Sequence, residues 1–173
     1  YRARVGALGR GWTHSYEITL QKRSDGSIVI NGPSGFDRIF NSDGQGGYKP
    51  GIGDYGRLIP LPENEFLLIE RNGHRTHFRS DGRFNWVQDP NGNRVSASYD
   101  ELGRLIALVH STGDQFRLEY NSDGRLITLT DHVGRVTHFA YDTTGEHLMS
   151  VTGPDGRRTA YSYITGEDIL REH

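Results

Sequence analysis

The sequence contains no cysteine, which excludes disulfide bonds and thiolate chemistry. Hydrophobic residues make up only 34% of the 173 residues, a low share for a globular core. No apolar run approaches the roughly 20 residues that a membrane-spanning helix needs. The formal net charge of −2 gives no reason to expect a nucleic-acid partner or a membrane surface. Because aromatic residues that favour strands are nevertheless plentiful, we expect a folded β protein rather than a disordered chain.

Glycine is abundant instead, with 23 residues, and much of it recurs in register with aromatic residues. The aromatic repeat positions are Phe78, Tyr99, Tyr120 and Tyr141, at intervals of 21 residues, followed after 22 residues by Tyr163. A glycine turn follows each of the first four aromatics, at Gly82, Gly103, Gly124 and Gly145. Another glycine turn falls about half a period later, at Gly92, Gly113, Gly134 and Gly156. A fixed period of this length is typical of a repeat architecture.

Each period has room for two strands, because a half-period of 10 or 11 residues leaves roughly six to eight residues for a strand after its turn. Tight turns at both ends of a strand force its neighbours to be antiparallel. We therefore predict an all-β fold: an antiparallel meander of β-hairpins that forms a curled strip or the open part of a β-shell, with little or no helix. Without helices to cover it, the sheet must curl on itself, pack on another sheet or close around a cargo.

The two strands of a period differ in their hydrophobic patterns. Return strands alternate, as where Phe116, Leu118 and Tyr120 share one face. Outgoing strands carry apolar residues three apart, such as Leu126 and Leu129. That spacing indicates a β-bulge or partial cover on both faces, and we favour the bulge. The repeat tyrosines are expected to pack on the inner face of the sheet, with a sugar-binding surface as the alternative.

Residues 1–77 are interpreted as a cap-like N-terminal β module that continues the sheet of the repeats, which occupy residues 78–173. Apolar residues alternate over residues 12–20 and predict a strand there. The glycine-rich residues 41–56 are expected to lack regular structure.

Two further segments carry local signals. Asn72-Gly73 is expected to form a two-residue hairpin loop, since this pair tolerates positive φ. Residues 164–173 fit either the start of a helix or the next repeat strand. Because the chain begins with Tyr1 and the repeat is still running near its other end, we expect it to be a piece of a longer protein.

Candidate catalytic and metal-binding side chains form no recognisable site. His74 and His77 are three apart on a predicted strand, so they point to opposite faces and cannot easily share an ion. His14 and Ser15 are adjacent strand residues that face apart, and no strained nucleophile turn accompanies them. We expect no catalytic residue, no metal and no cofactor, and we do not expect an enzyme.

Aspartates recur near the turns, at Asp81, Asp100, Asp123 and Asp142. We expect their carboxylates to accept hydrogen bonds from turn amides, which is the usual role of aspartate next to glycine. Calcium coordination is the alternative.

Three segments that begin at a repeat tyrosine share aspartate or asparagine at the second position and glycine at the fifth. They are Tyr99-Asp100-Glu101-Leu102-Gly103-Arg104-Leu105, Tyr120-Asn121-Ser122-Asp123-Gly124-Arg125-Leu126 and Tyr141-Asp142-Thr143-Thr144-Gly145. This pattern resembles the Rhs, or YD-repeat, family of bacterial proteins. Two departures from it are Asn121 in place of the aspartate and Glu146 in place of the turn arginine.

The N-terminal stretch from Leu8 to Tyr16, which contains Gly11, Trp12 and His14, is similar to the opening of the module that precedes YD repeats in Rhs proteins. The resemblance implies a β-strip that spirals into a hollow shell around a C-terminal toxin domain. It implies as partners the rest of that shell, the enclosed toxin and a secretion-system component, with surface carbohydrate or a cell-surface receptor as the alternative. It implies synthesis in the bacterial cytoplasm, followed by secretion or display at the cell surface. The family's self-cleaving aspartate motif is not in this chain, so no catalytic residue carries over.

Overall fold

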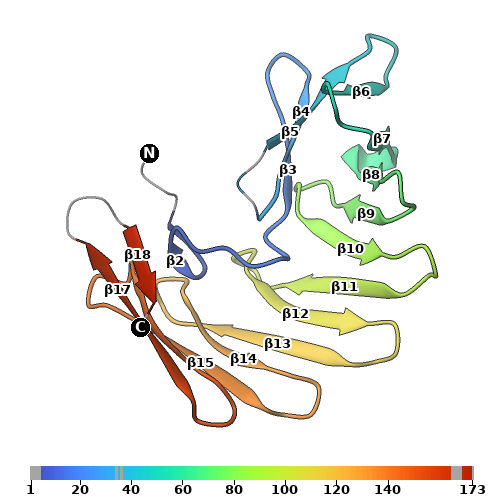
Figure 1. Ribbon diagram of the computed structural model, residues 1–173. Helices are drawn as coiled ribbons and strands as arrows, with labels where there is room; N and C mark the ends of the chain where they lie inside the picture. Colours follow the sequence, from blue (N-terminus) through green and yellow to red (C-terminus); the bar gives the residue numbers. More distant parts are fainter. Residues whose placement is uncertain (1–4, 34, 36, 165–168, 173) are drawn as a thin grey trace. The chain divides into compact units, whose positions relative to one another are not determined.

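The structure, a computed structural model, describes residues 5–33, 35, 37–164 and 169–172 (Figure 1). In this part of the chain nearly all regular structure is β, and strands pair antiparallel with their neighbours in sequence. The one helical segment among the described residues is the 3-10 turn η1 (Pro62–Asn64). The predicted all-β meander of hairpins with little helix is therefore confirmed.

The chain divides into two compact units. Unit 1 comprises residues 1–13, 99–108 and 114–173, and unit 2 comprises residues 14–98 and 109–113. The domain boundary expected after residue 77 stays a prediction. It marks where the sequence repeat begins, whereas the two units are defined by compactness.

Unit 2 begins with a small sheet in the order β3-β4-β5-β6. Its strands are β3 (Thr19–Lys22), β4 (Ile28–Asn31), β5 (Asp37–Ser42) and β6 (Tyr48–Pro50). Ile28 and Phe40 face each other across β4 and β5, and both are fully buried. The sequence predicts that all of residues 1–77 continue the sheet of the repeats. Strands β3 to β6 instead pair only among themselves and form a separate sheet. Only the later strands of that region join the repeats.

Those later strands follow in the order β7-β8-β9-β10-β11. They are β7 (Arg57–Pro60), β8 (Phe66–Ile69), β9 (Arg75–Phe78), β10 (Phe84–Gln88) and β11 (Arg94–Tyr99). The Leu20 amide donates to the Gly82 carbonyl at 2.7 Å, which joins β3 to the turn before β10. A Cβ atom at Gly82 would lie 2.1 Å from the Leu20 carbonyl oxygen, so this close backbone approach requires glycine.

Two local predictions in this region are wrong. The strand predicted over residues 12–20 is confined to β3, since residues 12–18 form turns and irregular backbone. Trp12 belongs to unit 1, whereas Tyr16 belongs to unit 2, where it stacks on Phe84 with ring centroids 5.9 Å apart. Residues 41–56 are not wholly irregular, because β6 pairs with β5 across a glycine hairpin that the Asp43 carboxylate closes.

Unit 1 holds a short N-terminal hairpin and the later repeats. Its strands are β1 (Val5–Gly6), β2 (Gly9–Arg10), β12 (Leu105–His110), β13 (Gln115–Tyr120), β14 (Leu126–Thr130), β15 (Val136–Tyr141), β16 (Leu148–Thr152), β17 (Arg158–Ile164) and β18 (Ile169–Glu172). Strands β12 to β18 follow in sequence order (Figure 1). Of residues 164–173, β18 pairs with β17, as the strand alternative predicts, and residues 165–168 and 173 lie outside the described residues.

The predicted bulge is confirmed in the outgoing strands. Glu119 pairs with Thr128 and Tyr120 with Leu126, which leaves Ile127 as the extra residue of β14. The same shift makes Met149 the extra residue of β16 and Asn85 that of β10. Each bulge lets the two apolar residues three apart point to the same face. Leu126 and Leu148 are buried as a result.

The glycine turns share one geometry. Asn121 donates its amide to the Arg125 carbonyl at 2.9 Å, and Gly124 donates to the Asn121 carbonyl at 3.0 Å. The eight repeat glycines named above have φ between 68° and 98°, whereas Glu63 and Asn64 are the non-glycine residues with positive φ in the described chain. This is a type I turn followed by a left-handed glycine. The two-residue loop predicted at Asn72-Gly73 is wrong, because that turn uses the same geometry and Gly73 alone supplies the positive φ.

Candidate functional site

Three repeat tyrosines form a ladder of hydroxyl hydrogen bonds in unit 1. Tyr120 donates to the Leu105 carbonyl at 2.7 Å, Tyr141 to the Leu126 carbonyl at 2.7 Å, and Tyr163 to the Leu148 carbonyl at 2.8 Å. In each pair the acceptor precedes the donor by 15 residues and is the first residue of the preceding outgoing strand. Each tyrosine therefore ties its own strand to the strand before it, next to the bulge. We call this set the tyrosine ladder.

Burial keeps the hydroxyls of Tyr141 and Tyr163 protonated. It raises the pKa of Tyr141 well above the usual range of tyrosine. Burial also raises the pKa of Tyr163, although the hydrogen bond that Trp12 donates to its hydroxyl opposes this. Both side chains are half-buried, so their hydroxyls act as donors throughout the physiological pH range.

The other two repeat aromatics differ. Phe78 is fully buried in unit 2 and has no hydroxyl, and Tyr99 is half-buried at the end of β11. Sequence reasoning placed all five aromatics on one face but missed the hydroxyl acceptors. The constant spacing of 15 residues between a strand-opening leucine and the next tyrosine is the signal that could have found them.

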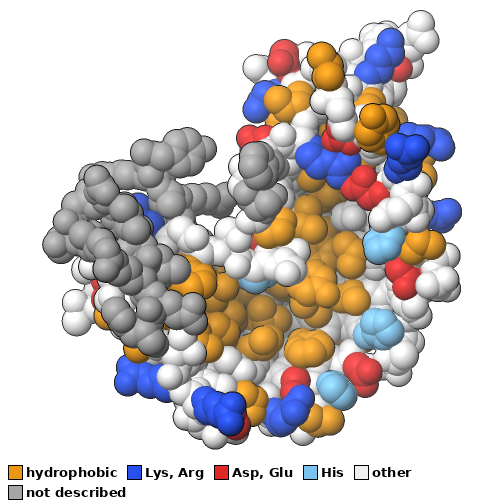
Figure 2. Space-filling model, viewed as in Figure 1, with side chains coloured by type: hydrophobic (Ala, Val, Ile, Leu, Met, Phe, Trp, Pro, Cys, Tyr) orange, Lys and Arg blue, Asp and Glu red, His pale blue; other side chains and the backbone are white. Residues whose placement is uncertain are grey.

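The ladder side of the sheet carries the apolar residues of unit 1. Leu118 pairs with Leu129, and Phe139 with Val151, and these residues are buried or half-buried. Phe116, at the open end of this face, is 39% exposed. Figure 2 shows hydrophobic side chains gathered across the sheet, with charged side chains mostly at the turns that border it.

Arginines that follow the turn glycines connect consecutive turns. Arg125 donates from Nε to the Gly145 carbonyl at 2.5 Å, and Arg104 donates to the Asn121 carbonyl at 3.5 Å. The Arg104 guanidinium also lies 5.2 Å from the centre of the Tyr120 ring. Turns of successive repeats are thus linked by side chains as well as by strand pairing.

The residue after each repeat tyrosine closes the turn. Asp100 accepts a hydrogen bond from the Arg104 amide at 2.8 Å, and Asn121 accepts one from the Arg125 amide at 2.9 Å, so asparagine replaces aspartate here without loss of the turn. Asp81 accepts from the Arg83 amide at 3.0 Å. Asp123 instead donates its own amide to Asn121. No group of three or more potential metal ligands is present among the described residues.

Residues 142–147 form the one turn that is a residue longer than the others described above. Asp142 donates its amide to the His147 carbonyl at 3.0 Å, and His147 Nδ1 lies 2.8 Å from the Asp142 carboxylate. Arg104 makes the corresponding side-chain contact with Asp100 at 2.7 Å. His147 therefore makes the side-chain contact of the arginine, whereas Glu146 keeps the amide hydrogen bond of the arginine, at 3.0 Å to Asp142. Counted by side-chain contacts, Glu146 is the inserted residue.

The Asp142 carboxylate is strongly stabilised in its charged form. Burial raises its pKa, but hydrogen bonds from His147, Thr144 and the backbone amide of Glu146 outweigh this and lower the pKa to about 2. The pKa of Asp100 is lowered in the same way, against an opposing effect of burial, by the amide and side chain of Arg104.

The residues of the N-terminal motif divide between the two units. Gly11 has φ of 77° and Trp12 packs edge-on against Tyr161 in unit 1, with ring centroids 4.8 Å apart. His14 and Tyr16 belong to unit 2. Burial lowers the pKa of His14, and its carbonyl accepts the Glu17 amide at 2.9 Å in a local turn.

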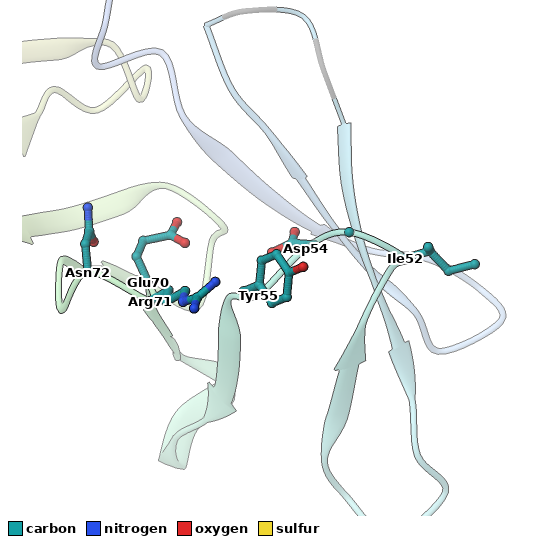
Figure 3. Close-up of a pocket in the computed structure, with 7 residues that line it drawn as sticks. Ile52, Asp54, Tyr55, Glu70, Arg71 and Asn72 are labelled. Carbon is teal, nitrogen blue, oxygen red and sulfur yellow. The ribbon is translucent and has the colours of Figure 1, made fainter.

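An open surface pocket in unit 2 was missed by sequence reasoning. Its lining comes from the β6–β7 connection and the β8–β9 turn: Ile52, Gly53, Asp54, Tyr55, Glu70, Arg71 and Asn72. Figure 3 shows the Arg71 side chain extending towards the Tyr55 ring, whose centre lies 5.2 Å from the guanidinium carbon, while Ile52 points away. Arg38 binds Asp54 at 2.8 Å and also pairs with Glu70, which fixes the two acidic side chains. No sequence pattern links these loop residues.

A family model described as the RHS repeat matches residues 120–146. The matched segment begins at a ladder tyrosine, contains β14 and β15, and ends in the lengthened turn. This chain carries an RHS repeat. The matched 27 residues cover one full period of the tyrosine ladder and run into the following turn. No curated protein matches the chain.

The described part of this chain contains no helix with the length and apolar character needed to cross a bilayer.

Proposed function

We propose that this chain is a non-catalytic wall segment of an Rhs-type shell, which encloses a C-terminal toxin domain and helps to deliver it. The observation that carries the proposal is the tyrosine ladder, part of which lies within the matched RHS repeat. Each repeat adds one hairpin and fastens it to the preceding strand, so the sheet extends sideways without needing a separate core. This is the property that a wall requires.

The partners proposed for the wall are the remainder of the same shell, the enclosed toxin domain and a component of a secretion system. The half-buried apolar face around Phe116 and Phe139 supports a role in covering something else, because an apolar sheet face is stabilised when another layer packs on it. Synthesis in the bacterial cytoplasm and later secretion or surface display belong to the same proposal.

The test uses the full-length protein, with Tyr120→Ala and Tyr141→Ala introduced together. Loss of two ladder bonds weakens the attachment between repeats, so the enclosed C-terminal domain should become accessible to protease and separate from the wall. Leu102→Ala is the matched control, since Leu102 is 75% exposed in a turn. Full protection of the C-terminal domain in a folded double variant would count against the proposal.

A second candidate is a carbohydrate- or receptor-binding module of a cell-surface protein. The Tyr55 pocket favours it, because Tyr55 is 69% exposed beside Arg71 and the fixed carboxylates of Asp54 and Glu70. An exposed aromatic face flanked by polar groups is suited to stacking on a sugar ring. The ladder tyrosines are less suited, since their hydroxyls are already donated to backbone carbonyls.

A glycan array probed with the intact chain separates the two candidates. Selective binding that Tyr55→Ala abolishes, and that Tyr120→Phe leaves unchanged, would favour the binding module. Absence of selective binding is the result expected of a wall segment.

A further inference from the structure

The inserted residue Glu146 is where the N-terminal hairpin attaches to unit 1. The Arg10 amide donates to the Glu146 carbonyl at 2.6 Å, and the Arg10 guanidinium pairs with the Glu146 carboxylate. The Arg10 side chain is only 15% exposed, so this pair is shielded from solvent more than a surface ion pair. The two residues are 136 positions apart in sequence.

Gly9 fits this contact for a steric reason. Its φ is 90°, and a Cβ atom there would lie 2.7 Å from the Glu146 carbonyl oxygen. A larger residue would therefore have to push the hairpin away from the turn. The turn thus accepts a glycine followed by an arginine.

The hairpin also contacts backbone and side-chain groups of the ladder repeats. The Leu126 amide, at the bulge of β14, donates to the Ala7 carbonyl at 2.8 Å, and the Tyr141 hydroxyl lies 3.3 Å from the same oxygen. Arg125 donates to the Gly6 carbonyl at 3.3 Å. These contacts extend the attachment from the lengthened turn to the preceding repeat.

Trp12 completes the attachment at the following repeat. Its indole Nε1 donates to the Tyr163 hydroxyl at 3.0 Å, and its ring packs on Tyr161. The hairpin and its flank therefore contact three successive repeats through a bulge amide, a turn carbonyl and a ladder hydroxyl. Glu146, which makes the central contact with Arg10, is the extra residue that lengthens the spacing from Tyr141 to Tyr163 to 22 residues.

We propose that residues 5–12 are a clasp and that the turn of residues 142–147 is its dedicated receptor, with Glu146 inserted into the repeat to recognise the Gly9-Arg10 dipeptide. The clasp joins the two ends of unit 1 and fixes which repeat the N-terminal segment meets. This inference stands on the contacts of unit 1 and does not require the shell proposal.

The primary test is amide hydrogen exchange in the intact chain carrying Gly9→Ala. The Leu126 amide, which the clasp protects, should exchange at least about tenfold faster, while the β14–β15 amides stay protected. Gly113→Ala is the matched control: Gly113 has φ of 98° and nothing lies within 4 Å of its added Cβ, so it carries the backbone strain without the clash. Unchanged Leu126 exchange in Gly9→Ala would overturn the proposal.

Deletion of Glu146 tests the receptor directly and does not rely on a strained glycine. The deletion restores the 21-residue period, so the hairpin between β15 and β16 should fold while the Leu126 amide loses protection and trypsin cleaves after Arg10. Arg10→Ala should act in the same direction, and Arg135→Ala, in a pair whose arginine is 64% exposed, should not. Retained protection of the clasp after deletion of Glu146 would show that the insertion is not its receptor.

Discussion

At the residue scale, the tyrosine of the repeat has two separate functions. Its ring fills the apolar face, and its hydroxyl binds the carbonyl that opens the preceding strand, as Tyr141 does with Leu126. Phenylalanine preserves the first function and removes the second. The tyrosine is thus specified by a backbone carbonyl and not by ring packing alone.

Tyr141→Phe is expected to lower the free energy of unfolding by about 1 kcal/mol, the usual contribution of one hydrogen bond. The reason is that the Leu126 carbonyl loses its tyrosine donor in a half-buried setting. Urea denaturation followed by fluorescence measures the change. Tyr55→Phe serves as the control, since Tyr55 is 69% exposed; an equal loss in both variants would refute a role for the ladder hydroxyl.

Asp142 gives a pH-dependent prediction. Its folded-state pKa of about 2 lies below the usual aspartate pKa of about 3.9, so the charged carboxylate adds stability above about pH 4, and this contribution is lost as the pH falls towards 2. Asp142→Asn keeps the turn acceptor, as Asn121 does naturally, but removes the charge. The variant should be less stable than the parent by about 1 kcal/mol at pH 7, with the difference shrinking at pH ~3.

Thermal unfolding at a series of pH values tests this dependence. The reverse change, Asn121→Asp, places a carboxylate at the same turn position one repeat earlier and should add a stability difference that declines in acid. A constant difference between Asp142→Asn and the parent from pH 7 to pH 3 would contradict the assignment.

At the scale of elements, bulges and glycine turns decide how strands meet. A bulge in the outgoing strands β10, β14 and β16 lets two apolar residues three apart share one face, and in β14 it leaves the backbone amide of Leu126 for another segment. At Gly82 the turn itself is the contact, because its carbonyl accepts the Leu20 amide. Turns with the same backbone geometry therefore differ in the segments that pack against them.

Gly82→Ala and Gly124→Ala separate backbone strain from steric clash. Both glycines have positive φ, 81° and 74°, so each substitution should cost about 1–2 kcal/mol for the left-handed conformation. Only Gly82 has a neighbour, the Leu20 carbonyl oxygen at 2.1 Å from the added Cβ, whereas nothing lies within 4 Å at Gly124. The Gly82 variant should lose a further 1–3 kcal/mol or so through overpacking, measured by chemical denaturation. An equal loss of stability in both variants would show that the backbone at Leu20 moves away from the added Cβ at little energetic cost.

At the scale of the whole molecule, stability is spread over small cores. Leu148 is 1% exposed in unit 1, and Ile28 is fully buried in the β3–β6 sheet of unit 2. In a repeat array the repeats contact mainly their sequence neighbours. Damage to one core should therefore remain local.

Leu148→Ala should lower the free energy of unfolding of the surrounding repeats by about 2–5 kcal/mol, because truncation of a buried leucine leaves an enclosed cavity. Hydrogen exchange measured by mass spectrometry should show faster exchange across β14 to β17, with β4 and β5 unchanged. Ile28→Ala should give the opposite pattern. Uniformly faster exchange in either variant would mean that the two units unfold together.

Much of this architecture is determined by the sequence itself. The 21-residue register of tyrosine and glycine dictates antiparallel hairpins, since only short turns fit between strands of that length, and the apolar spacing of Leu126 and Leu129 dictates a bulge. These are local properties, because backbone φ, strand period and turn length are set by residues near one another in sequence.

Only the tertiary structure decided the long-range partners. Alternation over residues 12–20 suggests a strand, yet Trp12 packs on Tyr161 and Tyr16 on Phe84, and no local pattern specifies those partners. Likewise Glu146 looks like a substituted arginine until its carbonyl is seen to bind Arg10. The physical reason is that such contacts join groups up to 151 residues apart, and their energies depend on positions that only the folded backbone defines.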